Sequence, residues 1–175
     1  MRAAAARAAE AALGPAPAKR ARDKNRPAQP AGARLSLGEL DGLLGFHLRL
    51  AQAALYRDFT ASLAKLDLTQ RQFATLELVR ANPGASQAHL AEVLTLDRPA
   101  MMAVVDRLEQ RGLVLRERSA SDRRRQEIRL TEAGRDLLEQ ATRRVRRHDS
   151  RFLSRFGRAD AKALIGWLRR IHGRG

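Results

Sequence analysis

The stretch 86–131 restricts the possible folds of this chain more than any other part of the sequence. Ser86 begins a short helical pattern, and Asp97 is placed to cap a second one that a glycine ends. Two short strand patterns follow, at residues 113–115 and 126–130, with a polar segment between them. This order predicts a helix-turn-helix with a β-hairpin, or wing, directly behind it.

The chemistry of this stretch favours DNA as a partner. A helix of the predicted length fits the major groove, where the edges of all base pairs can be told apart. A basic hairpin beside it can reach a minor groove or the phosphates. The whole chain has 34 Lys and Arg against 19 Asp and Glu, a net charge of +15, and 30 of the basic residues are Arg. Arginine binds phosphates and guanine edges in a bidentate manner.

Long helical patterns lie on both sides of this stretch. Residues 36–66 read as one long helix, with Ser36 and Glu39 spaced as a capping box and with two apolar faces. Two apolar faces require two surfaces to pack against, the chain's own core and, as the second, a partner subunit. Thr69 begins another helix. Thr131 is placed to cap a long helix that runs to about residue 156, and residues 158–172 form a final helix. The expected fold class is mainly α with a small β-hairpin wing, a winged helix-turn-helix flanked by long dimerisation helices.

Residues 1–34 differ in composition from the rest of the chain. They contain eight basic residues, two acidic ones and four of the six prolines, with almost no large apolar side chains. Such a segment cannot offset the entropy of ordering. We therefore predict a disordered basic N-terminal arm at 1–34, before a domain at 35–175. The arm is either a solvated tail or a source of phosphate contacts; an organellar transit peptide fits less well because prolines follow so soon.

Several classes of function lack the residues they need. The chain has no cysteine, which excludes disulfides, cysteine zinc sites and thiol redox sensing. The four histidines have no metal-ligand spacing, so no metal site is expected. No Gly-rich phosphate loop, catalytic triad or carboxylate pair stands in a convincing frame, so no catalytic residue and no enzyme is predicted. No apolar run approaches the about 18 residues of a membrane span, and a cytoplasmic protein is expected.

Specific motifs within residues 68–134 resemble the MarR family of winged-helix regulators. The similarity lies in residues 68–73 (LTQRQF), 90–92 (LAE), 106–114 (DRLEQRGLV), 122–124 (DRR) and 130–134 (LTEAG). The long flanking helices, about 36–66 and 132–172, fit the same family, with the winged helix-turn-helix at about 69–131. The resemblance implies a homodimer held by its terminal helices, which binds double-stranded DNA at a palindromic operator and acts as a regulator, most often a repressor.

The resemblance also points to residues that contact DNA. Arg124 is similar to the family arginine that enters the minor groove, and Asp122 to the acid that orients it. Ala100, Met102 and Ala103 depart from the Ser, Thr or Arg common in the family, and apolar side chains contact only groups such as the thymine methyl. The expected DNA contacts are Ser86, Gln87, Arg98, Pro99, Ala100, Met102, Ala103, Arg107, Asp122, Arg123, Arg124 and Arg125.

A second set of segments resembles the branch of this family that responds to hydroxycinnamoyl-CoA thioesters. These segments are residues 44–51 (LGFHLRLA), 56–59 (YRDF), 101–105 (MMAVV) and 118–122 (RSASD). The resemblance implies p-coumaroyl-CoA or feruloyl-CoA as a small-molecule effector, and no cofactor. The expected ligand contacts are His47, Arg49, Tyr56, Arg57 and Phe59, although His47 and Phe59 fit core or dimer packing equally well.

Two other kinds of nucleic-acid binding remain to be compared with operator binding. A sequence-nonspecific protein that coats DNA fits the net charge of +15. It also fits the few polar residues on the recognition helix, the predicted helix that Asp97 caps and that would enter the major groove. Operator binding survives an excess of competitor DNA, whereas coating does not. Recognition of RNA would need exposed aromatic residues for base stacking, and the chain has one Trp and one Tyr.

Overall fold

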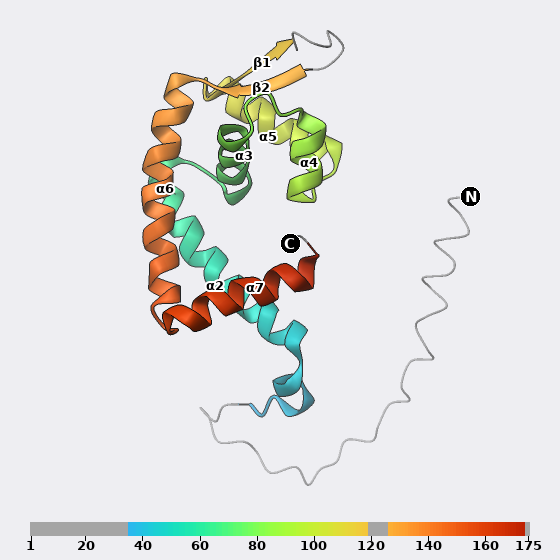
Figure 1. The fold of residues 1–175 in the computed structure, drawn as a ribbon, viewed down its shortest axis with the longest axis vertical. Coiled ribbons are helices and arrows are strands. Elements are labelled where there is room, and N and C mark those ends of the chain that lie inside the picture. Colours follow the sequence, from blue (N-terminus) through green and yellow to red (C-terminus); the bar gives the residue numbers. More distant parts are fainter. Residues whose placement is uncertain (1–34, 119–125, 174–175) are drawn as a thin grey trace, which may run out of the picture. The chain divides into compact units, whose positions relative to one another are not determined.

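The computed structural model describes residues 35–118 and 126–173 (Figure 1). Of these, residues 40–118 and 126–173 belong to one compact unit, and residues 35–39 belong to a separate one. The predicted arm and the tip of the wing lie outside the described residues. Within the described part, no helix has both the length and the apolar composition that crossing a membrane requires.

A winged helix-turn-helix occupies the middle of the chain, as the sequence predicts. Helices α3 (Gln70–Ala81), α4 (Gln87–Leu94) and α5 (Arg98–Gln110) precede strands β1 (Val114–Arg118) and β2 (Gln126–Leu130). The strands pair antiparallel, with Val114 opposite Leu130. Helix α3 packs against α4, α5 and β2, and Figure 1 shows it between α4 and α6. We refer to residues 68–130 as the lobe.

The lobe is organised around apolar side chains that lose all or nearly all contact with solvent. They come from each of its helices and from β2: Leu76, Val79, Leu90, Met101, Val105, Leu108 and Ile128. Burial of one such side chain stabilises a fold by roughly 1.5–3 kcal/mol. Met101 lies on the buried face of α5, as the apolar spacing of that helix predicts.

Polar side chains cap the helices of this region where the sequence predicts helix starts. Asp97 Oδ1 accepts a hydrogen bond from the Ala100 amide at 2.7 Å, and Thr131 Oγ1 accepts one from the Gly134 amide at 2.9 Å. Thr69 forms a full capping box with Gln72. Each cap satisfies an amide that has no partner within its own helix, which is worth about 1 kcal/mol.

Helix α6 (Glu132–Leu153) approaches the lobe so closely that its first turn has room only for glycine. A Cβ atom added at Gly134 would lie 1.9 Å from the backbone oxygen of Leu113. Thr131 strengthens the same contact, because its hydroxyl donates to the Gly112 carbonyl at 2.7 Å. The residues just before β1 and the start of α6 are thus in direct backbone contact.

The prediction of one continuous helix over 36–66 is wrong. The chain forms a 3-10 helix η1 (Gly38–Gly42), an extended residue Leu43, helix α2 (Leu44–Leu63) and a 3-10 turn η2 (Ala64–Leu66). The expected capping box is also wrong: Ser36 Oγ accepts from the Gly38 amide at 3.3 Å. Gly38 has a φ of +54°, a left-handed conformation that ends regular helix and that glycine adopts at little cost.

The terminal helices differ from the lobe in how they use their apolar residues. Helix α2 packs against α6 and buries Phe59 and Leu63 near its C-terminal end. The N-terminal half of α2 exposes Leu44 and Leu50. Helix α7 (Arg158–His172) has the predicted bounds but contains no buried residue. Its apolar side chains are half-buried, as Leu164 and Leu168 are, or exposed, as Trp167 and Ile171 are.

Candidate nucleic-acid interface and ligand pocket

Helix α5 has a buried face and two exposed flanks with different neighbours. Met101, Val105 and Leu108 fill the core from one side of the helix. Asp106 and Glu109 lie on the flank that meets β1. Ala100, Ala103, Val104 and Arg107 lie on the other flank, at the spacing of successive helical turns. The predicted recognition helix therefore contacts the wing on one side and a hollow on the other.

An arginine on the wing holds α5 and β1 together. Arg116 donates to Asp106 through Nη2 and to Glu109 through Nη1. The three side chains are partly shielded from water, which strengthens charge-assisted hydrogen bonds. No local sequence pattern predicts this contact, since Arg116 and its two acceptors belong to different elements. As a result, the recognition helix and the wing form one mechanical unit.

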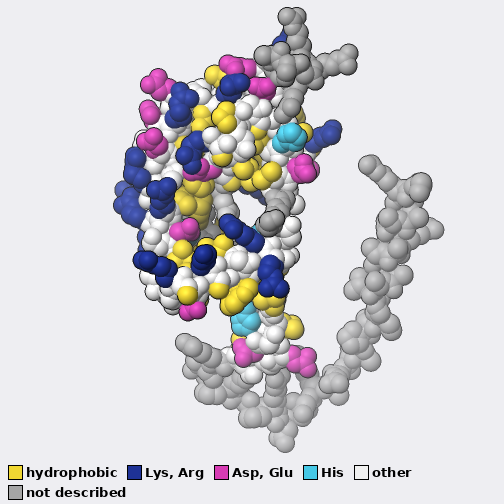
Figure 2. Space-filling view, viewed as in Figure 1, with side chains coloured by type: hydrophobic (Ala, Val, Ile, Leu, Met, Phe, Trp, Pro, Cys, Tyr) yellow, Lys and Arg dark blue, Asp and Glu magenta, His cyan; other side chains and the backbone are white. Residues whose placement is uncertain are grey.

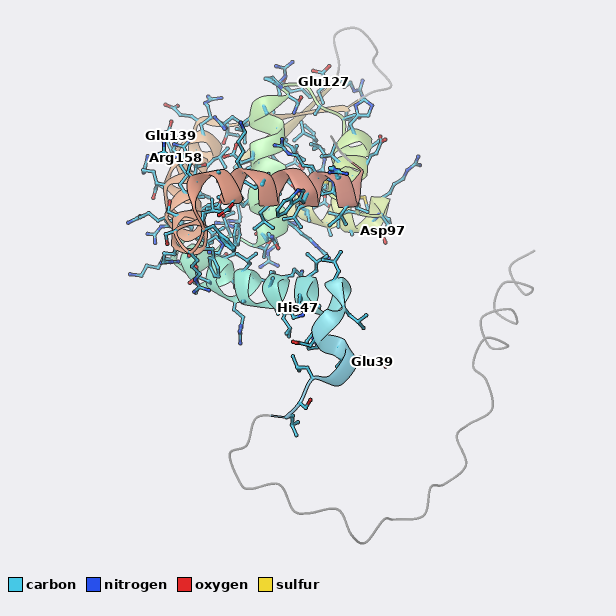
Figure 3. All side chains as sticks on the ribbon, turned by 60° about the horizontal axis from the view of Figure 1, so that its bottom comes forward. Glu39, His47, Asp97, Glu127, Glu139 and Arg158 are labelled. Carbon is cyan, nitrogen blue, oxygen red and sulfur yellow. The ribbon has the colours of Figure 1, made fainter. Side chains whose placement is uncertain are left out.

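The predicted DNA contacts fall into four groups. Ala100, Ala103 and Arg107 form the first, on the flank of α5 that lines the hollow. Arg98, Pro99 and Met102 are exposed at the start of α5, where Asp97 caps the helix. Figure 3 shows Asp97 at the edge of the lobe. Ser86 and Gln87 lie half-buried at the start of α4. The Ser86 hydroxyl accepts from the His89 amide at 3.4 Å. Asp122, Arg123, Arg124 and Arg125 lie outside the described residues.

A hollow of about 850 Å³ separates α2 from α5. Protein sites for small molecules are typically about 300–1,000 Å³, so its size suits such a ligand. Its walls come from α2, from the junction between α2 and α3, from the first turn of α3, and from α5. The lining residues are Gln52, Tyr56, Asp67, Thr69, Gln70, Arg71, Gln72, Ala100, Ala103, Val104 and Arg107. Two guanidinium groups against one carboxylate make this lining suitable for an anion.

Of the predicted ligand contacts, the structure places only Tyr56 at this hollow. His47 lies near the start of α2 (Figure 3), where its Nε2 is 2.7 Å from the carbonyl oxygen of Asp41. The Arg49 guanidinium lies over the Phe46 ring, 5.5 Å from its centroid. Arg57 is exposed. The role of these residues in ligand binding stays a prediction.

Phe59, the remaining predicted ligand contact, belongs to the core. It is 8% exposed and meets the rings of Phe73 and His148 edge-on, at centroid distances of 5.8 and 5.5 Å. This is the packing alternative that the sequence leaves open for Phe59. Burial among aromatic rings accounts for the residue without a ligand.

The sequence contains weak signals for lining residues that were not predicted as ligand contacts. Gln52 lies four residues before Tyr56 on α2, and residues at that spacing share a helix face. Arg71 lies in the 68–73 motif, which carries part of the family resemblance. Its place in the hollow follows from the packing of α3 on α5, which no local pattern predicts.

Another arginine joins two walls of the hollow. Arg111, at the C-terminal end of α5, donates through Nη2 to the Leu66 carbonyl at 3.0 Å and through Nη1 to the Asp67 carbonyl. Asp67 has a φ of 47° and lines the hollow. The junction between α2 and α3 is thereby attached directly to the end of the predicted recognition helix.

A polar cluster links α2 to α6 outside the hollow. One oxygen of Asp58 is 2.5 Å from both His148 Nδ1 and Arg151 Nη2. The hydrogen bond from His148, and next the one from Arg151, lower the pKa of the Asp58 carboxyl below its ordinary value. His148 is 3% exposed and is thus a packing histidine. Within residues 35–118 and 126–173, no group of three or more Asp, Glu or His side chains could hold a metal ion.

Comparison with known proteins places these features in a family context. The profile of the MarR family matches residues 68–125, which span most of the lobe. A relative from Thauera aromatica is 35% identical over 150 residues, covering 85% of this chain and 90% of the relative. Its name links it to transcriptional regulation of the hcr operon.

Two solved structures of a transcriptional repressor, CouR, are similar to this chain over nearly their whole length. One, bound to a 23-mer DNA duplex, is 41% identical with a TM-score of 0.77 and covers 80% of this chain and 99% of that chain. The other, bound to p-coumaroyl-CoA, is 38% identical with a TM-score of 0.71 and covers 79% of this chain and 98% of that chain.

Proposed function

Because the chain belongs to the MarR family and is a DNA-binding transcriptional repressor rather than an enzyme, we propose that it binds a palindromic operator as a homodimer. We further propose that a hydroxycinnamoyl-CoA thioester releases it from this operator. The preferred effectors are p-coumaroyl-CoA and feruloyl-CoA. One observation carries the effector proposal: the hollow that suits a small anion is walled by the same helix that is predicted to enter the DNA.

The proposed mechanism is a shift between two positions of α5. A ligand releases DNA only if it binds the DNA-incompetent arrangement more tightly than the competent one. In this proposal the ligand occupies the space between α2 and α5, with its aromatic acyl group beside Tyr56 and the phosphates of its CoA part near Arg71 or Arg107. Any movement of α5 away from α2 changes the spacing of the two recognition helices in a dimer. The similarity to CouR structures with DNA and with p-coumaroyl-CoA supports this pair of states.

The proposed dimer interface uses the terminal helices. Trp167 and Ile171, four residues apart on one face of α7, are 58% and 56% exposed, and Ile165, on another side of the helix, is 43% exposed. Large apolar side chains left exposed on one helix mark an interaction surface. The exposed leucines in the N-terminal half of α2 extend the apolar surface available to a second copy.

The proposed DNA contacts combine α5 with the wing. Arg98 and Met102 are exposed on α5 and available to a major groove. Arg124, positioned by Asp122, is proposed for the minor groove, with Arg123 and Arg125 on phosphates. Ser86 and Gln87 at the start of α4 are proposed as phosphate anchors, because amides at a helix N-terminus favour anions.

The test is binding to labelled DNA from upstream of the protein's own gene, followed by fluorescence anisotropy with excess nonspecific competitor. Titration with p-coumaroyl-CoA and, separately, with p-coumaric acid identifies the effector class. Binding reversed by the thioester alone supports the whole proposal. Binding that neither compound disturbs rejects the effector, and binding abolished by the competitor favours a DNA-coating protein.

A matched pair of variants tests the location of the effector. Arg71→Gln removes a guanidinium from the hollow, whereas Arg49→Gln removes one that lies over Phe46. We expect Arg71→Gln to weaken thioester binding by about tenfold, the loss of one charge-assisted contact. Equal effects of the two substitutions would contradict the placement of the ligand in this hollow.

A further inference from the structure

We propose that Arg111 is the positioning residue that transmits occupancy of the hollow to the DNA-binding surface. The inference rests on the proposed ligand-responsive function of the hollow. Arg111 touches neither the hollow nor the exposed start of α5. Its guanidinium instead bridges two of the walls: it extends from the last residues of α5 to the carbonyls of Leu66 and Asp67.

The geometry of this bridge makes it sensitive to small displacements. A guanidinium is a rigid, planar fork, and here two of its nitrogens donate to consecutive backbone carbonyls. Such hydrogen bonds hold at about 2.7–3.2 Å and weaken beyond that range. The Arg111 Nη2 to Leu66 distance is already 3.0 Å. With the Arg111 side chain in its present conformation, a shift of α5 from the junction by about one ångström takes this distance beyond that range.

The acceptor side of the bridge belongs to the wall of the hollow. Asp67 lines the hollow and follows η2 in a left-handed backbone conformation with φ of 47° and ψ of 46°. Non-glycine residues adopt this conformation rarely, so the surroundings must hold it in place. Asp67 donates its own amide to the Ala64 carbonyl. The Arg111 fork and this turn together fix where α2 ends and α3 begins.

The donor side of the bridge leads to both parts of the DNA-binding surface. Arg107, one helical turn before Arg111, lines the hollow, and the Arg111 amide donates to the Arg107 carbonyl at 3.3 Å. Glu109 lies between them in sequence and binds Arg116 of the wing. A displacement at the α2–α3 junction thus reaches the recognition helix through Arg111 and the wing through Arg116.

A role limited to stability would have a different signature. Arginine side chains often bind the last carbonyls of a helix and act simply as caps. Loss of a cap lowers the free energy of unfolding but leaves the effect of a ligand on DNA affinity unchanged. Loss of a coupling residue instead lowers the factor by which each partner changes the affinity of the other, and this factor is reciprocal.

The experiment measures that coupling factor in the full-length protein. DNA affinity is measured with and without saturating p-coumaroyl-CoA, and thioester affinity with and without operator DNA. Couplings of this type are roughly 5–150-fold. In Arg111→Gln we expect each affinity alone to stay within about threefold of the parent protein and the coupling factor to fall below about threefold. Arg80→Gln is the matched control, because Arg80 binds Glu77 on α3 and does not line the hollow.

A second arm does not depend on the identity of the effector. Gln52→Trp fills the hollow from α2, which has no predicted contact with DNA. We expect this substitution to weaken operator binding in the parent protein and to have little effect in Arg111→Gln. If the thioester has no effect on the parent protein but Gln52→Trp gives this result, the proposed effector is wrong and the role of Arg111 is supported. Coupling that persists undiminished in Arg111→Gln in either arm, or loss of both single affinities together, overturns the role of Arg111.

Discussion

The lobe (residues 68–130) and helix α7 both have apolar residues at helical spacing, but these residues are buried in the lobe and several are exposed on α7. On α5, Met101, Val105 and Leu108 are fully buried. On α7, Trp167 and Ile171 have the same four-residue spacing as Met101 and Val105, yet they are 58% and 56% exposed. Figure 2 shows apolar side chains at the surface of one face of the molecule, among many basic ones.

The difference separates two jobs that an amphipathic helix performs. In the lobe, three helices and a hairpin supply one another's partners, so a single chain completes the core. Helix α7 brings an apolar face that the described part of its own chain covers only in part, with no residue fully buried. Periodicity therefore identifies an apolar face without saying whether the same chain or a second copy buries it.

The largest expected effect comes from a methyl group placed at the junction of the lobe with α6. Gly134→Ala puts a Cβ atom 1.9 Å from the Leu113 carbonyl oxygen, so backbone on one side must move. We expect a loss of more than about 3 kcal/mol in the free energy of unfolding, measured by urea denaturation.

Gly166→Ala on α7 is the matched control, since nothing lies within 4 Å of a Cβ atom there. Alanine has the higher helix propensity, so this change should stabilise the chain by about 0.5–1 kcal/mol. A Gly134→Ala protein as stable as the parent would contradict the close backbone contact. It would also remove the contrast in packing between the lobe and α7.

A second prediction concerns the exposed face of α7. Trp167→Ala should weaken self-association by about 2 kcal/mol, near thirtyfold, because large aromatic residues dominate interface energies. The lobe should keep its structure, since Trp167 contributes nothing to the core described above. Analytical ultracentrifugation over a range of concentrations measures the effect. Lys162→Ala on the same helix is the control, and equal association constants for parent and Trp167→Ala would show that α7 is not the interface.

The smallest effect is expected where α2 meets α6, between these two kinds of region. The pKa of Asp58 is lowered by the hydrogen bonds from His148 and Arg151, so the charged form is favoured in the folded protein. Its contribution to stability is present above the ordinary Asp pKa of about 3.9 and disappears as pH falls through the lower, folded-state pKa.

Asp58→Asn should therefore be less stable than the parent at pH about 7, with a difference that shrinks below pH about 4. Urea denaturation at several pH values measures this, with Asp149→Asn as an exposed control. A stability difference independent of pH would show that the Asp58 charge contributes nothing to the contact between α2 and α6.

The lobe could be predicted because its determinants are local. Asp97, Thr131 and the apolar positions of α5 each act within a few residues, and the structure confirms them. The break before α2 was missed because the apolar repeat continues through Gly38 and Gly42, where backbone conformation rather than hydrophobicity decides. Of the site, the DNA-binding elements were predicted, and the wing tip lies outside the described residues.

The hollow was largely missed because it is made by packing. Gln52, Arg71 and Arg107 come from three elements. They meet only when α3 packs on α5 and the turn at Asp67 sets the direction of α3 relative to α2. The bridges of Arg111 and Arg116 arise in the same way. Arg111 spans 44 positions to Asp67, a separation over which no periodicity carries information.

The alanines on α5 have a consequence for how such a regulator changes over time. Ala100 and Ala103 line the hollow from a helix proposed to contact DNA. A larger residue at either position adds surface for a new base contact and, by the same atoms, removes volume from the hollow. In the proposed function, a substitution at either position therefore changes operator preference and inducer preference together. Neither evolution nor protein engineering can alter one of these preferences there without altering the other.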